Sequence, residues 1–404
     1  MPAPEDTGGR FSPDKKAVYY LFLLGFFAIF STTISKNPVL PLFSEALGAN
    51  DAVIGLIAAV SPLAGILFSF PVGVMSDRIG RRKLLIAAGA VFLLAPILYL
   101  FLTDPLWLIP VRFFHGTATA ILGPVVSAVI AERFPDTKGE MLGQYASATL
   151  IGRSIAPLAG GIILSYFVVY PGLIPYRLVY VTAALAAVPV FILVLLYPKD
   201  GSGRLTTIPF SVFRESFLTF VKNRHLRGTA SVDMAIYFAF GAVETFLPLV
   251  LSARGFNAYE TGIVFSIQVL IIAVTKPFFG KIADRVDKRI QIVAGLLITG
   301  VSVVAIPFTA SFTGFIIVSC VFGAGMSLST VATSAYVADI ARKEEMGASM
   351  GALSSIMDIG QAAGPLFTGI IIGAAGYLTG FGVSFLLAIA VCMFFVVSAG
   401  DRAA

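Results

Sequence analysis

The chain has 404 residues, of which 57% are hydrophobic and only 12% are charged, and its mean hydropathy is +0.92. Soluble globular domains carry about 25% charged residues, so this composition excludes a soluble enzyme or a soluble binding domain. The net charge of +6 comes from 28 lysines and arginines against 22 acids. No basic segment interleaved with aromatic residues accompanies it, which argues against nucleic acid as a partner.

Apolar segments long enough to cross a membrane follow one another along almost the whole chain. A membrane-spanning helix needs roughly 20 apolar residues to cross a hydrocarbon core about 30 Å thick. Twelve segments meet this requirement, at residues 17–43, 52–75, 83–103, 106–131, 141–168, 176–197, 229–252, 260–280, 290–310, 313–338, 347–373 and 377–398. Because lipid offers no partner to free backbone N–H and C=O groups, each segment should be a helix. The sequence therefore predicts an all-α integral membrane protein with twelve transmembrane helices.

A polar segment separates the first six apolar segments from the last six. It spans residues 198–228, and we expect it to be a cytoplasmic linker that is partly an amphipathic helix. The predicted organisation is an N-terminal tail at 1–16, a six-helix bundle at 17–197, the linker at 198–228, a second six-helix bundle at 229–398 and a tail at 399–404. The first apolar segment is too long for a signal peptide and lacks its cleavage site, so it should remain as the first helix.

Lysine and arginine collect in the loops on one side of the predicted membrane. If the N-terminus is inside, 22 of the 28 basic residues lie in inner loops and tails, and only Arg177 and Arg254 lie in outer loops. The positive-inside rule then places both termini in the cytoplasm and the protein in the cell (inner) membrane. The same bias explains the basic charge as contact with anionic lipid of the inner leaflet.

Two charged loops, one in each half, repeat the same order of glycine, acid and bases. In the first loop these residues are Gly73, Asp77, Arg78, Arg81 and Arg82, and in the second loop they are Gly280, Asp284 and Arg285. The two glycines are 207 residues apart, and the same spacing relates Pro41 to Pro248. This spacing indicates that the chain is an internal duplication.

The two loops resemble the signature that follows the second and the eighth helix in the major facilitator superfamily, and the resemblance covers essentially the whole chain. It implies two pseudo-symmetric six-helix bundles that rock around a central substrate site. The loop residues are then expected to control this movement, with Arg78, Arg81 and Arg82 pairing with acids of the other half. The second loop departs from the pattern, since it has Asp287 where the first has Gly80.

The fifth predicted helix carries small residues at helical spacing. Gly152, Ala156 and Gly160 form a stripe that lets another helix approach closely, and Pro157 bends the helix. The whole pattern comprises Gly143, Gly152, Arg153, Pro157, Gly160 and Gly161. It resembles the antiporter motif of superfamily exporters, such as the twelve-span drug:proton antiporters, and therefore favours efflux over uptake.

Three acids lie inside predicted helices, where an ionisable side chain is costly and marks a functional site. Asp233 and Glu244 are eleven residues apart on the seventh helix, which is three turns or about 16 Å, so both should project from one face. Asp358 shares a stripe with Gln361 on the eleventh helix. Together with His115, these acids are the candidates for proton coupling, and a purely structural ion pair or hydrogen bond is the alternative for each acid.

The duplication places Glu244 opposite Asn37 and close to the level of Lys36, and the topology puts Arg112 at a similar depth. We therefore expect Lys36 or Arg112 to pair with Glu244. Helices 1, 4, 7 and 10 line the cavity in the superfamily. Here they supply the candidate substrate-binding residues Phe30, Thr33, Lys36, Asn37, Arg112, Tyr237 and Phe240. An aromatic cavity with few charges suits an amphipathic or lipophilic solute.

No pattern in the sequence indicates chemistry on a substrate. Cys320 and Cys392 stand alone in apolar helices, and neither a metal-ligand cluster nor a pair of nucleophile and base is found. We therefore expect no metal, no cofactor and no enzymatic activity, and a proton gradient as the driving force. The resemblance implies a monomer.

The leading hypothesis is a secondary active transporter that couples efflux of a small molecule to protons by alternating access. The first alternative keeps the fold and is an uptake carrier for a metabolite or nutrient, working as a symporter or a uniporter. A second alternative is a membrane protein that transports nothing, such as a sensor or an assembly factor. It finds no support in an extra domain or a long tail.

Overall fold

The computed structural model describes residues 15–197, 222–341 and 346–399, and only the backbone for 15–17, 70–71, 73–79 and 346–348. The predicted tails and most of the predicted linker lie outside the described residues. The described part is built of helices: α1 Lys15–Ile34, α2 Val39–Ala46, α3 Asp51–Ile79, α4 Arg81–Tyr99, α5 Leu108–Arg133, α6 Lys138–Tyr166, α7 Ile174–Leu196, α9 Arg224–Ala253, α10 Ala258–Ala283, α11 Lys288–Ala305, α12 Phe312–Ile340 and α13 Met346–Ala399, with short 3-10 turns at Pro105–Trp107 and Ile306–Phe308.

Eleven segments of the described chain are long and apolar enough to cross a membrane, and the last of them contains two helices. That segment, Ser349–Ala399, has 51 residues, and one straight helix of that length would span about 75 Å, more than twice a hydrocarbon core. Gly376 interrupts it with a φ of 79°, a conformation that glycine adopts without steric cost. The described chain is therefore consistent with the twelve membrane segments that the sequence predicts. In the first of them, α1 and α2 are separated by residues 35–38, a break that the sequence reading did not foresee.

The internal duplication is visible at helix starts and in ion pairs. Asn50 and Asn257 are 207 positions apart, and each accepts a backbone N–H at the start of the helix that follows, α3 or α10. The ion pair of Lys288 with Asp339, at 2.8 Å, joins α11 to α12. Its counterpart 207 positions earlier is the pair of Arg81 with Glu132, which joins α4 to α5. The two halves therefore share local contacts as well as helix order.

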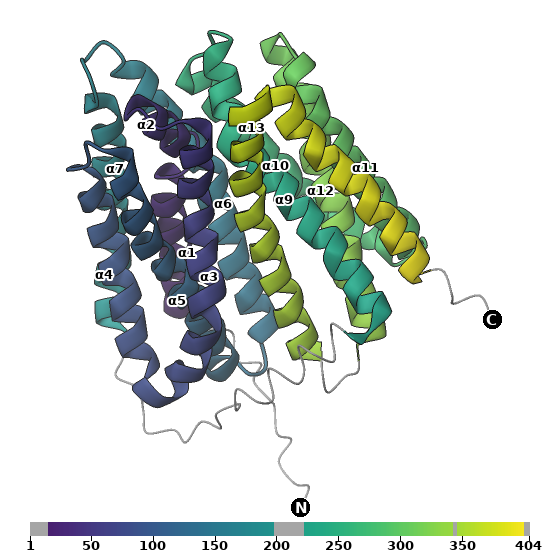
Figure 1. The fold of residues 1–404 in the computed structure, drawn as a ribbon. Helices are drawn as coiled ribbons and strands as arrows, with labels where there is room; N and C mark the ends of the chain where they lie inside the picture. The colour runs from purple at the N-terminus through teal and green to yellow at the C-terminus, as the bar shows by residue number, and fades with distance from the viewer. Residues whose placement is uncertain (1–14, 198–221, 342–345, 400–404) are drawn as a thin grey trace, which may run out of the picture.

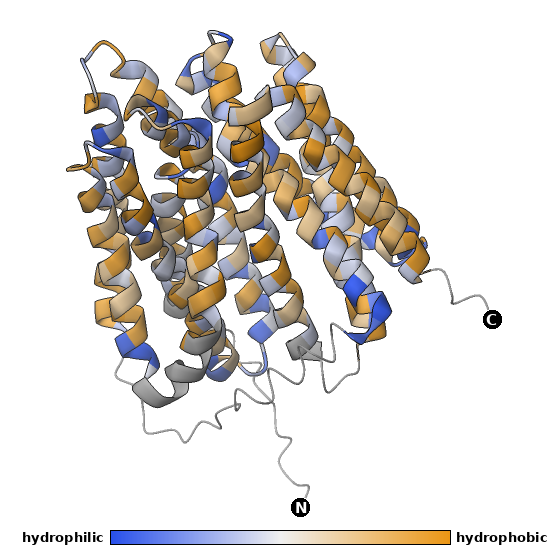
Figure 2. Cartoon of the chain, viewed as in Figure 1, coloured by the Kyte–Doolittle hydropathy of each residue, from blue (hydrophilic) through white to orange (hydrophobic). Residues whose placement is uncertain are grey.

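Helices α1–α7 form the first half and helices α9–α13 form the second half. Within the first half, α1 packs on α6, α3 on α5 and α4 on α7, and within the second half α9 packs on α13 and α10 on α12. The halves meet mainly through two helix pairs, α3 with α13 and α6 with α10, and α9 makes smaller contacts with α2 and α3. Figure 1 shows α3 and the first part of α13 side by side. Hydrophobic residues predominate along the helices (Figure 2), and many large apolar side chains of the described residues are exposed, as contact with lipid requires.

The halves meet through backbone contacts at one end of the molecule. We call the end where α7 stops and α9 begins the linker end, and the opposite end the far end. Near the far end, a Cβ atom on Gly55 would lie 2.2 Å from the carbonyl oxygen of Pro365, and one on Gly161 would lie 2.3 Å from that of Ala258. Only glycine permits such close approach. The two halves are therefore closed against each other at the far end.

Candidate functional site

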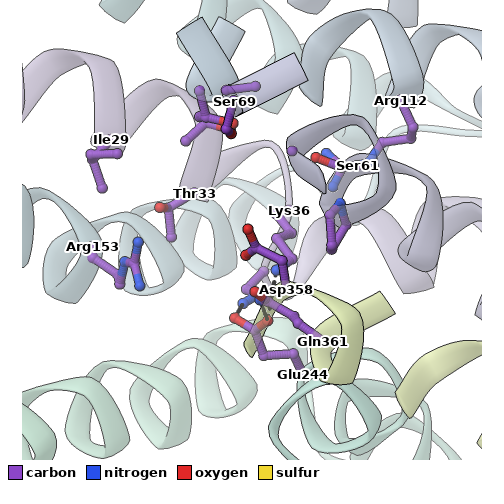
Figure 3. A pocket seen from close by; sticks show the side chains of 16 residues that line it. Ile29, Thr33, Lys36, Ser61, Ser69, Arg112, Arg153, Glu244, Asp358 and Gln361 are labelled. Carbon is purple, nitrogen blue, oxygen red and sulfur yellow. Dashed lines mark hydrogen bonds and ion pairs between the residues drawn. The ribbon is translucent and has the colours of Figure 1, made fainter. Parts of the chain in front are cut away.

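A cavity of about 290 Å³ lies between the two halves. It is lined by Ile29, Thr32, Thr33, Lys36, Asn37, Ser61, Pro62, Gly65, Ser69, Arg112, Thr119, Ala120, Arg153, Glu244, Asp358 and Gln361 (Figure 3). Most of these side chains are polar, and five of them carry a charge. The Gly55 and Gly161 contacts close the molecule beyond the cavity toward the far end.

Both halves supply hydrogen-bond donors to the carboxylate of Glu244. The residue is 9% exposed and comes from α9. It accepts hydrogen bonds from Lys36 Nζ at 2.6 Å and from Asn37 Nδ2 at 2.8 Å, both in the first half. Gln361 Nε2 on α13 donates a third at 3.2 Å. The expected pairing of Glu244 with Lys36, and its place opposite Asn37, are confirmed.

The break between α1 and α2 brings Lys36 and Asn37 to this position. After Ile34 the backbone N–H groups of Lys36 and Asn37 both bond to the carbonyl oxygen of Thr33, at 3.0 and 2.9 Å. Pro38 follows, and because proline has no N–H and restricts the residue before it, a regular helix does not continue through this point. The two side chains therefore reach across to α9.

Arg112 lines the cavity but does not pair with Glu244. Its side chain is among the largest fully buried ones, with the residue 1% exposed, and it lies beside Tyr99 of α4. Among the described residues no acid forms an ion pair with it, and its Nε has no hydrogen-bond partner. Arg112 is thus a buried cation that faces a cavity without an opposing carboxylate.

His115 does not reach the cavity. It is 1% exposed, packs edge-on against Phe92 and tilted against Tyr99, and neither ring nitrogen has a hydrogen-bond partner. Helical spacing placed it near the face of Arg112. The packing of α4 against α5 instead encloses it within the first half. His115 is not among the residues that line the cavity, and its part in proton coupling stays a prediction.

Asp233 lies apart from Glu244, although both belong to α9. It is completely buried, and Thr333 Oγ1 of α12 donates a hydrogen bond of 2.8 Å to it. It is not among the residues that line the cavity. A common helix face therefore does not give these two acids a common environment, because Glu244 meets the first half whereas Asp233 meets α12.

Asp358 and Arg153 line the cavity from opposite halves. Asp358 belongs to α13, and one of its carboxylate oxygens lies next to Gly65 of α3, where an added Cβ would be 3.7 Å from it. Arg153 belongs to α6, inside the antiporter-like pattern. Within the described chain, neither residue forms an ion pair.

The expected aromatic side chains do not line the described cavity. Phe30 stacks on Phe26 with ring centroids 5.8 Å apart, while Phe240 stacks on Phe322 and contacts Tyr237. None of these rings is among the lining residues. The rings pack against one another because that removes more apolar surface than facing a polar cavity. Thr33, Lys36, Asn37 and Arg112 do line it.

The contribution of α3, the second predicted membrane helix, to the cavity was not predicted from the sequence. Ser61, Pro62, Gly65 and Ser69 of α3 all line it, as does Thr119 of α5. The available signal was a small polar stripe in an otherwise apolar segment, since Ser61, Gly65 and Ser69 recur at every fourth residue. Such a stripe is equally compatible with close helix packing, which is why spacing alone did not distinguish a cavity wall.

The first charged loop joins helices of its own half. Arg81 pairs with Glu132 of α5, and Arg82 donates from Nε to the carbonyl oxygen of Tyr197 at 2.9 Å. The expected pairing with acids of the other half is therefore not what the described contacts show, because α5 and α7 end directly beside this loop. Gly73, Asp77 and Arg78 belong to α3, but their side chains lie outside the described residues.

The second charged loop lies at the surface of its half. Asp284 and Arg285 are exposed, and Gly280 lies near Val331 of α12.

The antiporter-like pattern lies on α6 and faces neighbouring helices. An added Cβ on Gly152 would lie 2.7 Å from the carbonyl oxygen of Phe26 on α1, and one on Gly160 would lie 3.2 Å from the side chain of Val39 on α2. Gly143 has open space around it, and Pro157 meets Gly262 of α10 through its carbonyl oxygen. The pattern therefore forms the contacts of α6 with α1 and α10.

Comparison with known proteins agrees with this architecture. The sequence profile of the Major Facilitator Superfamily matches residues 21–272 and 229–403. Multidrug resistance protein 2 of Bacillus subtilis is 24% identical over 369 residues, which covers 89% of each chain. An MFS-type transporter of Methanocaldococcus jannaschii is 23% identical over 342 residues, which covers 84% of this chain and 87% of that one.

A homologue of the multidrug efflux pump PmrA from Lactococcus lactis is 22% identical, again over 89% of each chain. Among solved structures, the nucleoside transporter NupG superposes with a TM-score of 0.80 at 13% identity, covering 95% of this chain and 99% of that chain. This similarity concerns the fold alone. The profile match covers nearly the whole chain, and the chain therefore belongs to the Major Facilitator Superfamily, as a membrane transporter and not an enzyme.

Proposed function

We propose that this protein exports a small amphipathic solute in exchange for protons. One observation carries the proposal: Glu244 of the second half is bound by Lys36 and Asn37 of the first half at the closed side of the cavity. A proton on Glu244 removes its negative charge and with it the ion pair to Lys36. Protonation therefore weakens a contact that holds the halves together.

Alternating access is supported by this contact and by the glycine contacts near the far end. The cavity is closed on that side, so a solute can leave there only after α3 separates from α13 and α6 from α10. A proton that enters from the far side and neutralises Glu244 favours the separated state. After the halves have closed at the far end with the proton bound, its loss to the linker side restores the ion pair and stabilises the closed far end.

Export rather than uptake is supported by two observations. The relatives from Bacillus subtilis and Lactococcus lactis are named as a multidrug resistance protein and as a homologue of a multidrug efflux pump. The antiporter-like pattern on α6 also forms close helix contacts, at Gly152 with α1 and at Gly161 with α10. We place the linker end and both termini in the cytoplasm, the protein as a monomer in the cell membrane, and the proton gradient as the driving force.

An uptake carrier for a metabolite is the second candidate. It is favoured by the lining of the cavity, which is mostly polar and includes no aromatic ring among the described residues. Such a lining suits a solute rich in hydrogen-bonding groups better than a lipophilic one. In that case proton and solute move in the same direction.

The test is transport by the protein reconstituted in liposomes that contain a pH-sensitive dye. A proton gradient is imposed, and lipophilic cations, neutral drugs and small polar metabolites are added in turn. We expect solute-triggered movement of protons against the direction of the solute, and its loss in Glu244→Gln. Asp104→Asn keeps the cap of the turn at 105–107 and serves as the control.

Transport by Glu244→Gln with unchanged dependence on pH would rule out the coupling role of this residue. Movement of solute and protons in one direction would exclude export and select the uptake carrier. Asp233→Asn and Asp358→Asn in the same assay show which of the three acids coupled transport requires. We expect Asp233→Asn to keep coupled transport, since Asp233 is hydrogen-bonded to Thr333 outside the cavity.

A further inference from the structure

The charges of the cavity are separated by half. Lys36, Arg112 and Arg153 come from the first half, while Glu244 and Asp358 come from the second. Lys36 and Glu244 neutralise each other across 2.6 Å. Arg112 and Arg153 on one wall and Asp358 on the other are left without an ion-pair partner in the described part of the chain.

Arg112 is the strongest sign of an anionic ligand group. An arginine inside a membrane costs about 2.5–3.5 kcal/mol on insertion scales unless it meets a polar partner. Arg112 is 1% exposed and its Nε makes no hydrogen bond. The neighbouring Tyr99 and His115 bring no negative charge. A carboxylate in the cavity would supply both the missing charge and acceptors for the guanidinium.

Asp358 marks the opposite wall as a place for a cationic group. Asp358 lines the cavity, and one of its carboxylate oxygens lies beside Gly65, which has no side chain. The lining around both walls is formed by short hydroxyl and amide side chains, with Ile29, Pro62 and Ala120 as the apolar ones. At about 290 Å³ the cavity lies at the small end of the range for ligand sites.

We propose that the substrate is a compact zwitterion, with an acidic group bound by Arg112 and Arg153 and an amine bound by Asp358. The inference rests on the proposed function, to which it adds the substrate class. An amine and a proton cannot both neutralise Asp358, so substrate and proton load in alternation. This competition at Asp358 adds to the protonation of Glu244, which remains the coupling step of the proposed function.

Three compounds that share the leucine side chain test the charge requirement. Leucine is a zwitterion, N-acetylleucine is an anion and leucinamide is a cation, and a phenylalanine series repeats the comparison with a larger side chain. The full-length protein is kept in detergent without a proton gradient, and its thermal stabilisation is titrated with each compound. We expect at least one zwitterion to bind tenfold or more tightly than both of its singly charged forms.

Variants assign each charged group of the ligand to its wall. Asp358→Asn should abolish the preference for leucine over N-acetylleucine while N-acetylleucine still binds. Arg153→Gln should weaken leucine and N-acetylleucine alike, and Asp104→Asn in a loop of the far end should change neither. A preference for leucinamide, equal binding of all three forms, or no binding of any of them in either series would overturn the inference.

The inference and the proposed function fail in different ways. Binding in detergent requires no transport, so a protein that prefers the zwitterion but moves no protons in liposomes refutes only the proposed function. A protein that exchanges lipophilic cations for protons and rejects the zwitterion refutes only the inference. Both assays use the same protein preparation, so a difference between their outcomes cannot come from a difference in folding.

Discussion

At the scale of single residues, Glu244 differs from the other acids in the membrane because its partners come from both halves. Lys36, Asn37 and Gln361 satisfy it from the end of α1 and from α13. Asp233 has Thr333. Two acids of the same helix therefore have different environments, and this difference depends on neighbours that are 100 or more residues away in sequence.

Loss of Lys36 should destabilise the protein. In Lys36→Met the carboxylate of Glu244 keeps only its two amide donors, and we expect a loss of about 1.5–3 kcal/mol, the range for a hydrogen bond to a charged group. The double variant Lys36→Met/Glu244→Gln should recover part of this loss, because no unpaired charge then remains. Thermal unfolding in detergent measures both. Losses that simply add in the double variant would mean that the pair contributes nothing.

The repeated ion pairs offer a second test at this scale. The side chain of Arg81 is 8% exposed and that of Lys288 is 21% exposed, and each pairs with an acid 51 positions later. We expect Arg81→Gln to lower the unfolding temperature more than Lys288→Gln, since a more buried guanidinium loses more when its charge is removed. Equal effects of the two changes would show that burial does not govern these contacts.

At the scale of helices, contact between the halves depends on glycines whose place a larger side chain cannot take. Gly55 meets the backbone of α13, and Gly262 meets the backbone of α6 with an added Cβ 2.5 Å from the carbonyl oxygen of Pro157. Gly373 on α13 has nothing within 4 Å of such a Cβ. The helix pairs α3 with α13 and α6 with α10 therefore control how closely the far end can shut.

We expect Gly55→Ala to hold the far end apart. A Cβ at this position would lie 2.2 Å from a carbonyl oxygen, so the closed state would have to shift. In a background without Cys320 and Cys392, a cysteine at Ser61 reports access to the cavity. Gly55→Ala should raise labelling from the far side and lower it from the linker side, whereas Gly373→Ala should change neither. An unchanged labelling pattern in Gly55→Ala would contradict the closure described above.

At the scale of the whole molecule, the proposed alternating access requires the two halves to move as bodies around the cavity. Ser165 Oγ of α6 accepts a hydrogen bond of 2.8 Å from the backbone N–H of Tyr259 on α10, so residues of both halves are adjacent at the far end. Separation of the halves must break this contact. Contacts within each half, such as Arg81 with Glu132, can persist through the movement.

A disulfide across the halves should stop turnover reversibly. We expect Ser165→Cys/Tyr259→Cys, in the background without native cysteines, to lose transport when oxidised and to regain it when reduced. Ligand binding in detergent should survive, because the cavity forms with the far end closed. Each single cysteine variant should be insensitive to oxidation. Transport by the cross-linked protein would show that the far end does not need to open.

The sequence by itself determined where the membrane segments lie, that the chain is an internal duplication and that Glu244 lies opposite Asn37 and near Lys36. Lipid requires apolar runs of fixed length, and a duplicated chain repeats its contacts at fixed spacing, as Asn50 and Asn257 show. Only the tertiary structure decided that aromatic rings leave the cavity, that α3 supplies one wall and that His115 is enclosed within the first half. These outcomes depend on how helices distant in sequence pack, which helical periodicity cannot specify.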